Sequence, residues 1–470
     1  MSRIIKPTLI LLMSACIMVF LQSCEKQQPA AEPTDEAQPQ MSPPHPYTVV
    51  IISPHNEEIR TEMETAFTKY CKEEFGIDAK VDWMDVGTGS NRILKFIQKV
   101  YAHTKYYGHT DLIGVDMLFG GGEYTFQTLE KEGVLETLPL NDEVLANIPQ
   151  TFCGMEMYST DHKWCGNVLG TFGFLYNKEM LNATGATAPT KWEDLGGAEY
   201  FNQAVFADPT VSGSMAGAFE MIVQTSPDWQ SGWEKLLSIL SNAKKFTDSS
   251  NDAVDAPGLD EAIVSICIDF YGTSRASQAP DKLQYVTPKG QAGYTPDPIG
   301  IFKNASNRDM ANKFVDFLLS VKGQRIWALP KGHPDGPVEY SLNRIPISKA
   351  YYAQYDADTP EWIARPYAAD ADMMDMDMEM RTVRFGVLSE LVKTAAIDNI
   401  ELMQQAKKKL IDSGNSDDIK AMFYKLPENV DTLEEIKALA VELEAPEQTA
   451  QIAGIWRDFF KSQYEKILNN

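Results

Sequence analysis

An unbroken β-branched run at residues 49–52 constrains the fold more than any other feature of this 470-residue chain. A run without polar alternation predicts a strand buried on both faces, as in a parallel sheet. Ser53 ends the run, and Asn56 then precedes two glutamates, the arrangement expected at the start of a helix. A strand that feeds a helix through a short polar loop is typical of doubly wound α/β domains, whose ligands lie at the carboxyl ends of the strands. We therefore expect Ser53 and His55 to lie at the mouth of a binding cleft.

The strand-then-helix pattern recurs along the chain and predicts parallel, doubly wound sheets. From about residue 346 onward, long segments of helical periodicity replace it. Further strands are predicted at residues 77–83, 111–119, 168–177, 204–208, 264–271 and 298–302.

The first 23 residues have the composition of an export signal. Arg3 and Lys6 precede a short apolar core at residues 8–21, which is too short for a comfortable membrane span. The core ends in Leu-Gln-Ser-Cys, which resembles a bacterial lipobox, so Cys24 is the expected lipidation site; an ordinary signal peptide is the alternative. Residues 24–46 are rich in Pro, Gln, Ala and acidic residues and predict a disordered tether.

The net charge of −24 argues against binding to nucleic acid or to an anionic membrane surface. The net charge does not argue against the binding of a small anion, because the charge of a binding site is local. After the export signal there is no second long apolar segment, so no membrane-spanning helix is expected in the processed protein.

Four cysteines follow Cys24. Cys153 and Cys165 flank a short polar segment, and in an oxidising compartment they are expected to form a disulfide. Cys71 on an apolar helix face and Cys267 in an apolar strand are expected to be buried thiols. No zinc or other metal site is expected, because the chain has no C-x-x-C or H-x-x-x-H pair.

Several segments resemble the periplasmic solute-binding proteins of ABC importers. The most typical are YTPDPIGIFKNASN at 294–307 and ANKFVDFLLSVKGQ at 311–324. The similarity covers residues 47–345 well and residues 346–470 weakly. Three shorter segments are similar to the branch that binds ferric iron, thiamine, aminoethylphosphonate or sugar phosphates: IISPHNE at 51–57, WEDL at 192–195 and ADPTVSG at 207–213.

This resemblance implies an α/β, two-lobed type II periplasmic-binding-protein fold, with doubly wound sheets joined by crossover strands and a helical C-terminal extension. Lobe one is expected at 47–150 plus 290–345, and lobe two at 151–289 plus 346–470. The lobes are expected to close on a solute in the cleft. The implied protein is an exported, periplasmic, membrane-anchored lipoprotein. It delivers its solute chemically unchanged to an ABC permease and needs no cofactor.

Three loops offer helix N-termini, whose free N–H groups and dipole favour anions. They stand at residues 88–92, 120–122 and 212–214, and the first also carries Arg92, whose charge-assisted bonds are strong. With the neighbouring polar and aromatic side chains, the predicted solute contacts are Ser53, His55, Thr88, Gly89, Ser90, Arg92, Gly121, Gly122, Ser212, Gly213, Ser214, Asp269 and Tyr271.

A phosphonate or sugar phosphate is the favoured solute, and ferric iron or thiamine are the alternatives. His55 stands where the iron binders place a histidine, but Phe270 stands where their tyrosine pair begins. A thiamine-like cation would use Tyr271, Phe119 and Asp269. A ligand-sensing lipoprotein and an exported hydrolase are the rival classes. No nucleophile elbow supports the hydrolase, because the G-x-S-x-G spacing fails at residues 213–217.

Overall fold

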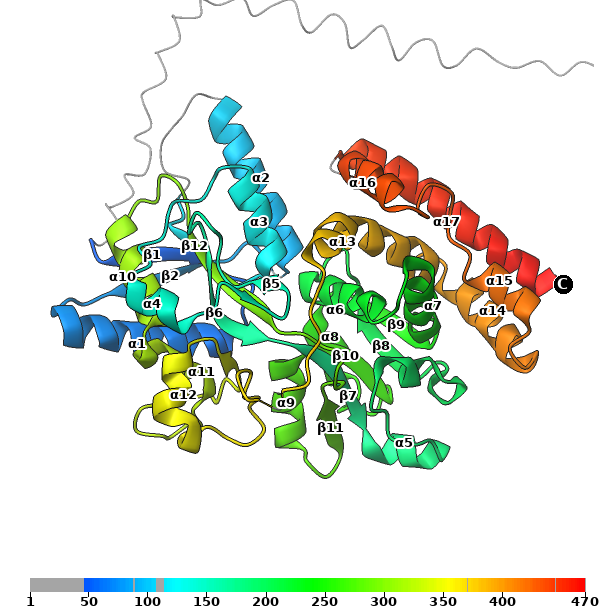
Figure 1. Cartoon of the computed structure of the whole chain (residues 1–470), viewed down its shortest axis with the longest axis horizontal. Coiled ribbons are helices and arrows are strands. Elements are labelled where there is room, and N and C mark those ends of the chain that lie inside the picture. The colour runs from blue at the N-terminus through cyan, green and yellow to red at the C-terminus, as the bar shows by residue number, and fades with distance from the viewer. Residues whose placement is uncertain (1–45, 88, 107–113, 370, 444, 470) are drawn as a thin grey trace, which may run out of the picture. The chain divides into compact units, whose positions relative to one another are not determined.

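The folded unit spans Tyr47–Asn470, and two separate sheets define two lobes within it (Figure 1). The expected export signal, the lipidation site at Cys24 and nearly all of the tether lie outside the described residues, as does Thr88. The computed structural model describes residues 46–87, 89–106, 114–369, 371–443 and 445–469.

The first lobe is built on a six-stranded mixed sheet. β1 pairs in parallel with β2 and β3, whereas β12 runs antiparallel to β3 and to β6. Val49 and Ile51 are fully buried in β1, as the β-branched run predicts. In spatial order the strands are β13 (Ile345–Pro346), β6 (Cys165–Gly170), β12 (Thr295–Ile301), β3 (Met117–Phe119), β1 (Thr48–Ile52) and β2 (Lys80–Met84).

The helix after β1 begins and ends as its sequence predicts. The Asn56 side chain accepts a hydrogen bond from Ile59 N at 3.1 Å, and Gly76 ends the helix with a φ of 69°. Among the described residues, the helices of this lobe are α1 (Glu57–Phe75), α2 (Ser90–Tyr106), α3 (Glu123–Lys131), α4 (Asp142–Asn147), α10 (Arg308–Leu319), α11 (Val321–Ala328) and α12 (Lys349–Tyr355).

The second lobe is built on a five-stranded sheet. β8 pairs in parallel with β9 and β10, and β7 runs antiparallel to β10 and β11. The strands are β11 (Leu283–Val286), β7 (Phe172–Asn177), β10 (Val264–Ile268), β8 (Ala204–Ala207) and β9 (Ala243–Thr247). The helices are α5 (Lys178–Thr184), α6 (Gly213–Gln224), α7 (Trp229–Leu240), α8 (Ser250–Asp255) and α9 (Asp269–Gln278).

The chain passes from one sheet to the other at Thr171. The predicted single strand at 168–177 is therefore two strands, β6 in the first sheet and β7 in the second. The Thr171 hydroxyl donates to Gly293 O at 3.0 Å, and its carbonyl accepts from Asp269 N at 2.9 Å. The first sheet thus extends past the predicted lobe boundary at residue 151, and the boundary is corrected to the crossover.

The predicted strand at 264–271 ends at Ile268. Asp269, Phe270 and Tyr271 form the first turn of α9 instead. An acidic residue is favourable in the first turn of a helix, and the bond from Asp269 N to Thr171 O ties this turn to the crossover.

The disulfide predicted between Cys153 and Cys165 is wrong, because both are free thiols. Cys165 is fully buried in β6, where its thiol donates to Gly166 O at 3.3 Å. Cys153 lies in the turn between β4 (Thr151–Phe152) and β5 (Met155–Glu156), with a φ of 51°. The segment that follows folds back so that Tyr158, rather than Cys153, bridges to Cys165.

The C-terminal residues form a helical extension, as predicted. α13 packs on α6 of the second lobe, and α14 packs on α17 (Figure 1). α12 remains with the first lobe, where the Tyr352 hydroxyl donates to Pro346 O at 3.0 Å. The extension consists of α13 (Met378–Val392), α14 (Ile400–Asp412), α15 (Asp417–Phe423), α16 (Leu433–Glu442) and α17 (Pro446–Asn469).

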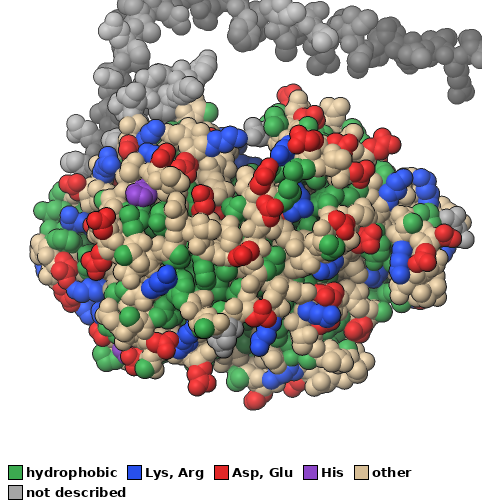
Figure 2. Space-filling model, in the orientation of Figure 1, with side chains coloured by type: hydrophobic (Ala, Val, Ile, Leu, Met, Phe, Trp, Pro, Cys, Tyr) green, Lys and Arg blue, Asp and Glu red, His purple; other side chains and the backbone are tan. Residues whose placement is uncertain are grey.

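The surface carries both signs of charge. On the face shown in Figure 2, Lys and Arg side chains are interspersed with Asp and Glu over both lobes rather than gathered into one basic patch. No helix in the described part of the chain has the length and hydropathy needed to cross a membrane.

Candidate functional site

A cavity of about 240 Å³ lies between the two lobes. Its walls include the segments that follow β1, β2 and β3 in the first lobe and those that follow β8, β9 and β10 in the second. The carboxyl ends of strands from both sheets therefore meet at one place, as expected for ligand sites in α/β folds.

Nine of the predicted solute contacts line this cavity, and they come from both lobes. They are His55, Gly89, Ser90, Gly121, Gly122, Ser212, Gly213, Ser214 and Tyr271.

Three other predicted contacts lie away from it. Ser53 supports the site indirectly, because its hydroxyl accepts from His55 N at 3.1 Å. Arg92 is exposed and folds back on Gly87, where an added methyl group would lie 2.9 Å from Arg92 Nη1. Asp269 is buried behind the cavity wall with its Oδ1 atom unpaired among the described residues. Burial raises the pKa of Asp269 to about 7.

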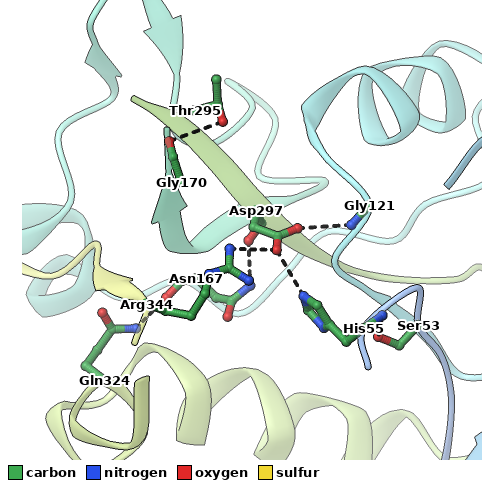
Figure 3. Close-up of polar contacts among 9 residues, drawn as sticks. All are labelled: Ser53, His55, Gly121, Asn167, Gly170, Thr295, Asp297, Gln324 and Arg344. Carbon is green, nitrogen blue, oxygen red and sulfur yellow. Dashed lines mark hydrogen bonds and ion pairs between the residues drawn. The ribbon is translucent and has the colours of Figure 1, made fainter. Parts of the chain in front are cut away.

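Asp297 organises the wall that the first lobe provides (Figure 3). Its Oδ1 accepts from Gly121 N at 3.0 Å, and its Oδ2 accepts from His55 Nε2 and from Arg344 Nη2, both at 2.9 Å. Burial alone favours the neutral acid, but the charge of Arg344 and the bonds to His55 and Arg344 outweigh it and hold the pKa of Asp297 well below its usual range. An ionised carboxylate thus fixes three donors around one point.

Arg344 is the most informative residue of the site. It is fully buried, and its guanidinium lies 4.2 Å from the centre of the Phe270 ring and 5.4 Å from that of Trp327. One donor bonds Asp297, while Nε and Nη1 have no acceptor among the described residues. Unpaired donors on a buried guanidinium call for an acceptor, and a guanidinium matches acceptor-rich groups such as carboxylates and phosphates.

His55 is a neutral part of the same wall. Burial lowers its pKa, although the carboxylate of Asp297 opposes the shift, so the ring donates from Nε2 at neutral pH. Its position requires glycine at residue 120, which has a φ of 83° and where an added methyl group would lie 2.5 Å from the ring.

Hydroxyl groups form the wall that the second lobe provides. Ser212 caps α6, with its Oγ accepting from Met215 N at 3.2 Å, and it also lies 2.6 Å from Ser250 Oγ and 3.1 Å from Ser214 Oγ. The first turn of α6 carries no acidic residue. In the cavity lining, Phe270 packs on Tyr271 with ring centres 4.2 Å apart.

The lobes contact each other at the edge of the cavity. Asn91 Nδ2 at the start of α2 donates to Pro209 O at 3.5 Å and to Thr210 O at 3.4 Å. On another side, Arg381 of α13 forms a buried ion pair with Glu123, the first residue of α3.

Sequence reasoning missed the charged core of the site. Asp297 stands inside the segment that carries the family resemblance, so its position was a usable signal. Arg344 and Arg381 follow no spacing rule and reach the cavity only through the tertiary fold. Among the described residues, no group of three or more His, Cys, Asp or Glu side chains is arranged to hold a metal ion.

Solved structures with this architecture are periplasmic binding proteins. The chain aligns with the periplasmic binding protein P5PA with a TM-score of 0.57 and 19% identity, covering 74% of this chain and 98% of that one. It aligns with AfuA of Actinobacillus pleuropneumoniae, solved with fructose 6-phosphate bound, with a TM-score of 0.56 and 19% identity over 78% and 98% of the two chains. The alignment with iron-bound HitA of Pseudomonas aeruginosa has a TM-score of 0.54 and 17% identity. It covers 73% of this chain and 98% of HitA. The fold is thus that of the two-lobed periplasmic binding proteins.

Sequence comparison adds the family. The profile described as bacterial extracellular solute-binding protein matches residues 112–389, more than half of the chain, and the protein belongs to that family. The phosphoglycerate transport regulatory protein PgtC of Salmonella typhimurium is 27% identical over 157 residues. That match covers 33% of this chain and 38% of PgtC.

Proposed function

We propose that this solute-binding protein captures a small phosphorylated organic anion in the interlobe cavity and delivers it unchanged to an ABC permease. The observation that carries the proposal is Arg344, a fully buried guanidinium whose Nε and Nη1 donors lack acceptors among the described residues.

The argument rests on the cost of burying such a group. Unpaired buried donors cost about 1–3 kcal/mol each, and more when they are charged. Asp297 neutralises the charge of Arg344 but shares its oxygens with His55 and Gly121, so it leaves two guanidinium donors unused. A phosphoryl group presents acceptor oxygens in the geometry that a guanidinium fork matches best.

The opposite wall supports the same ligand chemistry. The hydroxyls of Ser212, Ser214 and Ser250 lie within 3.3 Å of one another beside the N-terminus of α6. The free N–H groups of a helix N-terminus with no acid in its first turn favour an anion.

The names of two similar proteins also favour a phosphorylated solute. PgtC is named for the transport of phosphoglycerate, and AfuA was solved with fructose 6-phosphate bound. Iron, which is bound in the solved structure of HitA, and a thiamine-like cation are disfavoured, because two of the three carboxylates in the lining, Asp297 and Glu123, are already paired with arginines.

We infer further that the mature protein is anchored outside the cytoplasm through a lipid on Cys24, with residues 24–46 as the tether. Mass spectrometry of the membrane-extracted protein tests this inference. An acylated N-terminal peptide that begins at Cys24 is expected, and an unmodified mature N-terminus contradicts the anchor.

Titration calorimetry of the soluble domain tests the proposed ligand. Fructose 6-phosphate, 3-phosphoglycerate, 2-aminoethylphosphonate, thiamine and ferric citrate are the probes. We expect one of the phosphorylated or phosphonate probes to bind and, at a hundredfold its Kd, to raise the free energy of unfolding by about 2.7 kcal/mol. Binding of thiamine or ferric citrate alone contradicts the proposal.

A further inference from the structure

Arg381 brings a second unused guanidinium donor to the cavity. It lies in the first turns of α13, in the C-terminal part of the chain, with 4% of its surface exposed. Its Nε and Nη2 atoms bond Glu123 Oε1, and its Nη1 has no acceptor among the described residues. Gly217 on α6 makes room for it, since an added methyl group there would lie 3.2 Å from Nη2 and 3.4 Å from Nη1.

Arg381 and Arg344 stand in different surroundings. Arg344 is held by Asp297 of β12 and packs on Phe270 and Trp327. Arg381 instead lies beside Gly217 of α6 and is held by Glu123 of α3. The two unused donor groups are therefore held by different elements and different carboxylates.

Arg384, one turn further along α13, forms a buried ion pair that serves as a comparison for Arg381. Arg384 is also buried, but it directs Nε and Nη2 to Glu220 Oε1 within the second lobe and packs over Trp229. It does not line the cavity. Arg384 thus anchors α13 to α6, whereas Arg381 extends from the same helix to the first lobe.

The contact with the first lobe is well defined. Tyr124 of α3 stacks on Phe385 of α13 with ring centres 4.1 Å apart and planes 15° from parallel. Asp377 N donates to Gln224 Oε1 at 2.7 Å and fixes the start of α13 on α6. The helix that carries Arg381 is therefore held on both lobes, and Arg381 itself lines the cavity with one buried guanidinium nitrogen, Nη1, unpaired among the described residues.

We infer that Arg381 forms a second anion subsite and that the solute carries two anionic groups, one at Arg344 and one at Arg381. This inference rests on the proposed function and narrows it to phosphorylated carboxylic acids. Glu123 is then a positioning residue that fixes the guanidinium without touching the solute.

The charge balance of the cavity agrees with a ligand recognised through directed donors. The described lining residues include three arginines, Arg60, Arg344 and Arg381, and three carboxylates, those of Glu123, Asp248 and Asp297. Because two of these carboxylates are bound to Arg381 and Arg344, the unused guanidinium edges, and not a net positive charge, select the solute.

Three ligands of matched carbon skeleton test the inference on the soluble domain: 3-phosphoglycerate with both anionic groups, glycerol 3-phosphate with the phosphoryl group, and glycerate with the carboxylate. For the wild-type protein, calorimetry is expected to give a Kd for 3-phosphoglycerate about 30-fold or more below that of either other ligand. Arg381→Met is expected to remove most of this preference, with a change of less than about threefold for glycerol 3-phosphate.

Two further variants separate a ligand role from a structural one. Arg384→Met loses a buried ion pair on the same helix and is expected to lower the Tm while leaving the preference for 3-phosphoglycerate intact. The double variant Glu123→Gln/Arg381→Met removes both charges of the interlobe pair, so it avoids a buried unpaired carboxylate and keeps the test available if Arg381→Met does not fold.

The outcomes are distinct. Equal affinity of the wild-type protein for glycerol 3-phosphate and 3-phosphoglycerate overturns the second subsite and leaves the proposed phosphorylated ligand standing. An equal loss for both ligands in Arg381→Met assigns both arginines to one anion and also overturns it. Failure of the wild-type protein to bind any phosphorylated probe overturns the inference together with the proposed function.

Discussion

The two walls of the cavity differ in chemistry. The charged wall consists of His55, Asp297 and Arg344 and belongs to the first lobe. The hydroxyl wall consists of Ser212, Ser214 and Ser250 and belongs to the second lobe. The charged wall is complete within one lobe, because Asp297 bonds both of its other members.

This difference assigns separate tasks to the lobes. An ionised carboxylate and a guanidinium supply strong, directional bonds whose geometry is fixed by buried neighbours. Neutral hydroxyls and a helix N-terminus supply weaker bonds that adapt to the orientation of an anion. We therefore expect the charged wall to supply most of the affinity and the hydroxyl wall to adjust it.

The largest effect is expected from Arg344→Met. Removing this side chain deletes the unused donors and leaves the buried carboxylate of Asp297 without its cation, so about 3–5 kcal/mol of stability and at least about a hundredfold in affinity are lost. Calorimetry and urea unfolding measure the two quantities. Arg344→Lys keeps the charge without the planar fork and is expected to recover stability more than affinity. Unchanged solute affinity in Arg344→Met would contradict the expectation that the charged wall supplies most of the affinity.

Gly120→Ala tests whether the charged wall requires a fixed His55. The added methyl group would lie 2.5 Å from the ring at a φ of 83°, so about 2–3 kcal/mol of unfolding free energy is expected to be lost. Gly122→Ala is the matched control, because its φ is 77° but nothing lies within 4 Å of the added group. It is expected to lose about 1 kcal/mol from backbone strain alone. Similar losses in both variants would mean that the ring is free to move.

The pH dependence of stability tests the burial of Asp269 behind the cavity wall. Burial raises its pKa from 3.8 to about 7 in the folded protein, so the folded state holds a proton that the unfolded state releases above pH 4. The stability from this group is complete below pH 4 and is lost as the pH rises to 7. Between pH 5 and 7 the wild-type protein should lose about 2 kcal/mol relative to Asp269→Asn. Parallel urea-unfolding profiles of the two proteins contradict this assignment.

The smallest effects are expected on the hydroxyl wall. Ser212→Ala removes both a hydroxyl of the cluster and the cap of α6, and it should cost about 1 kcal/mol of stability. Ser214→Ala removes a hydroxyl without a cap and should leave stability within about 0.5 kcal/mol. Both should weaken solute binding by about three- to tenfold, as expected for one neutral hydrogen bond. A hundredfold loss in Ser214→Ala would reverse the ranking of the walls.

Local sequence signals predicted the elements that bring the site together. Asn56 caps α1, Ser212 caps α6, and the loops after β1, β3 and β8 lie at the cavity as expected. These features depend on neighbours within a few residues, so the sequence states them directly. The predictions at Arg92 and at the Cys153–Cys165 pair failed because the direction of a side chain depends on the surrounding fold.

The sequence by itself determined the class of this protein: its alternating strands and helices, its helical C-terminal extension and the polar loops at the strand ends. The tertiary structure alone decided which charges meet. His55 and Asp297 are 242 residues apart and Arg381 and Glu123 are 258 apart. No periodicity links such positions, because strand order and the crossover at Thr171 set their distance. Burial then gives these few charged contacts their strength.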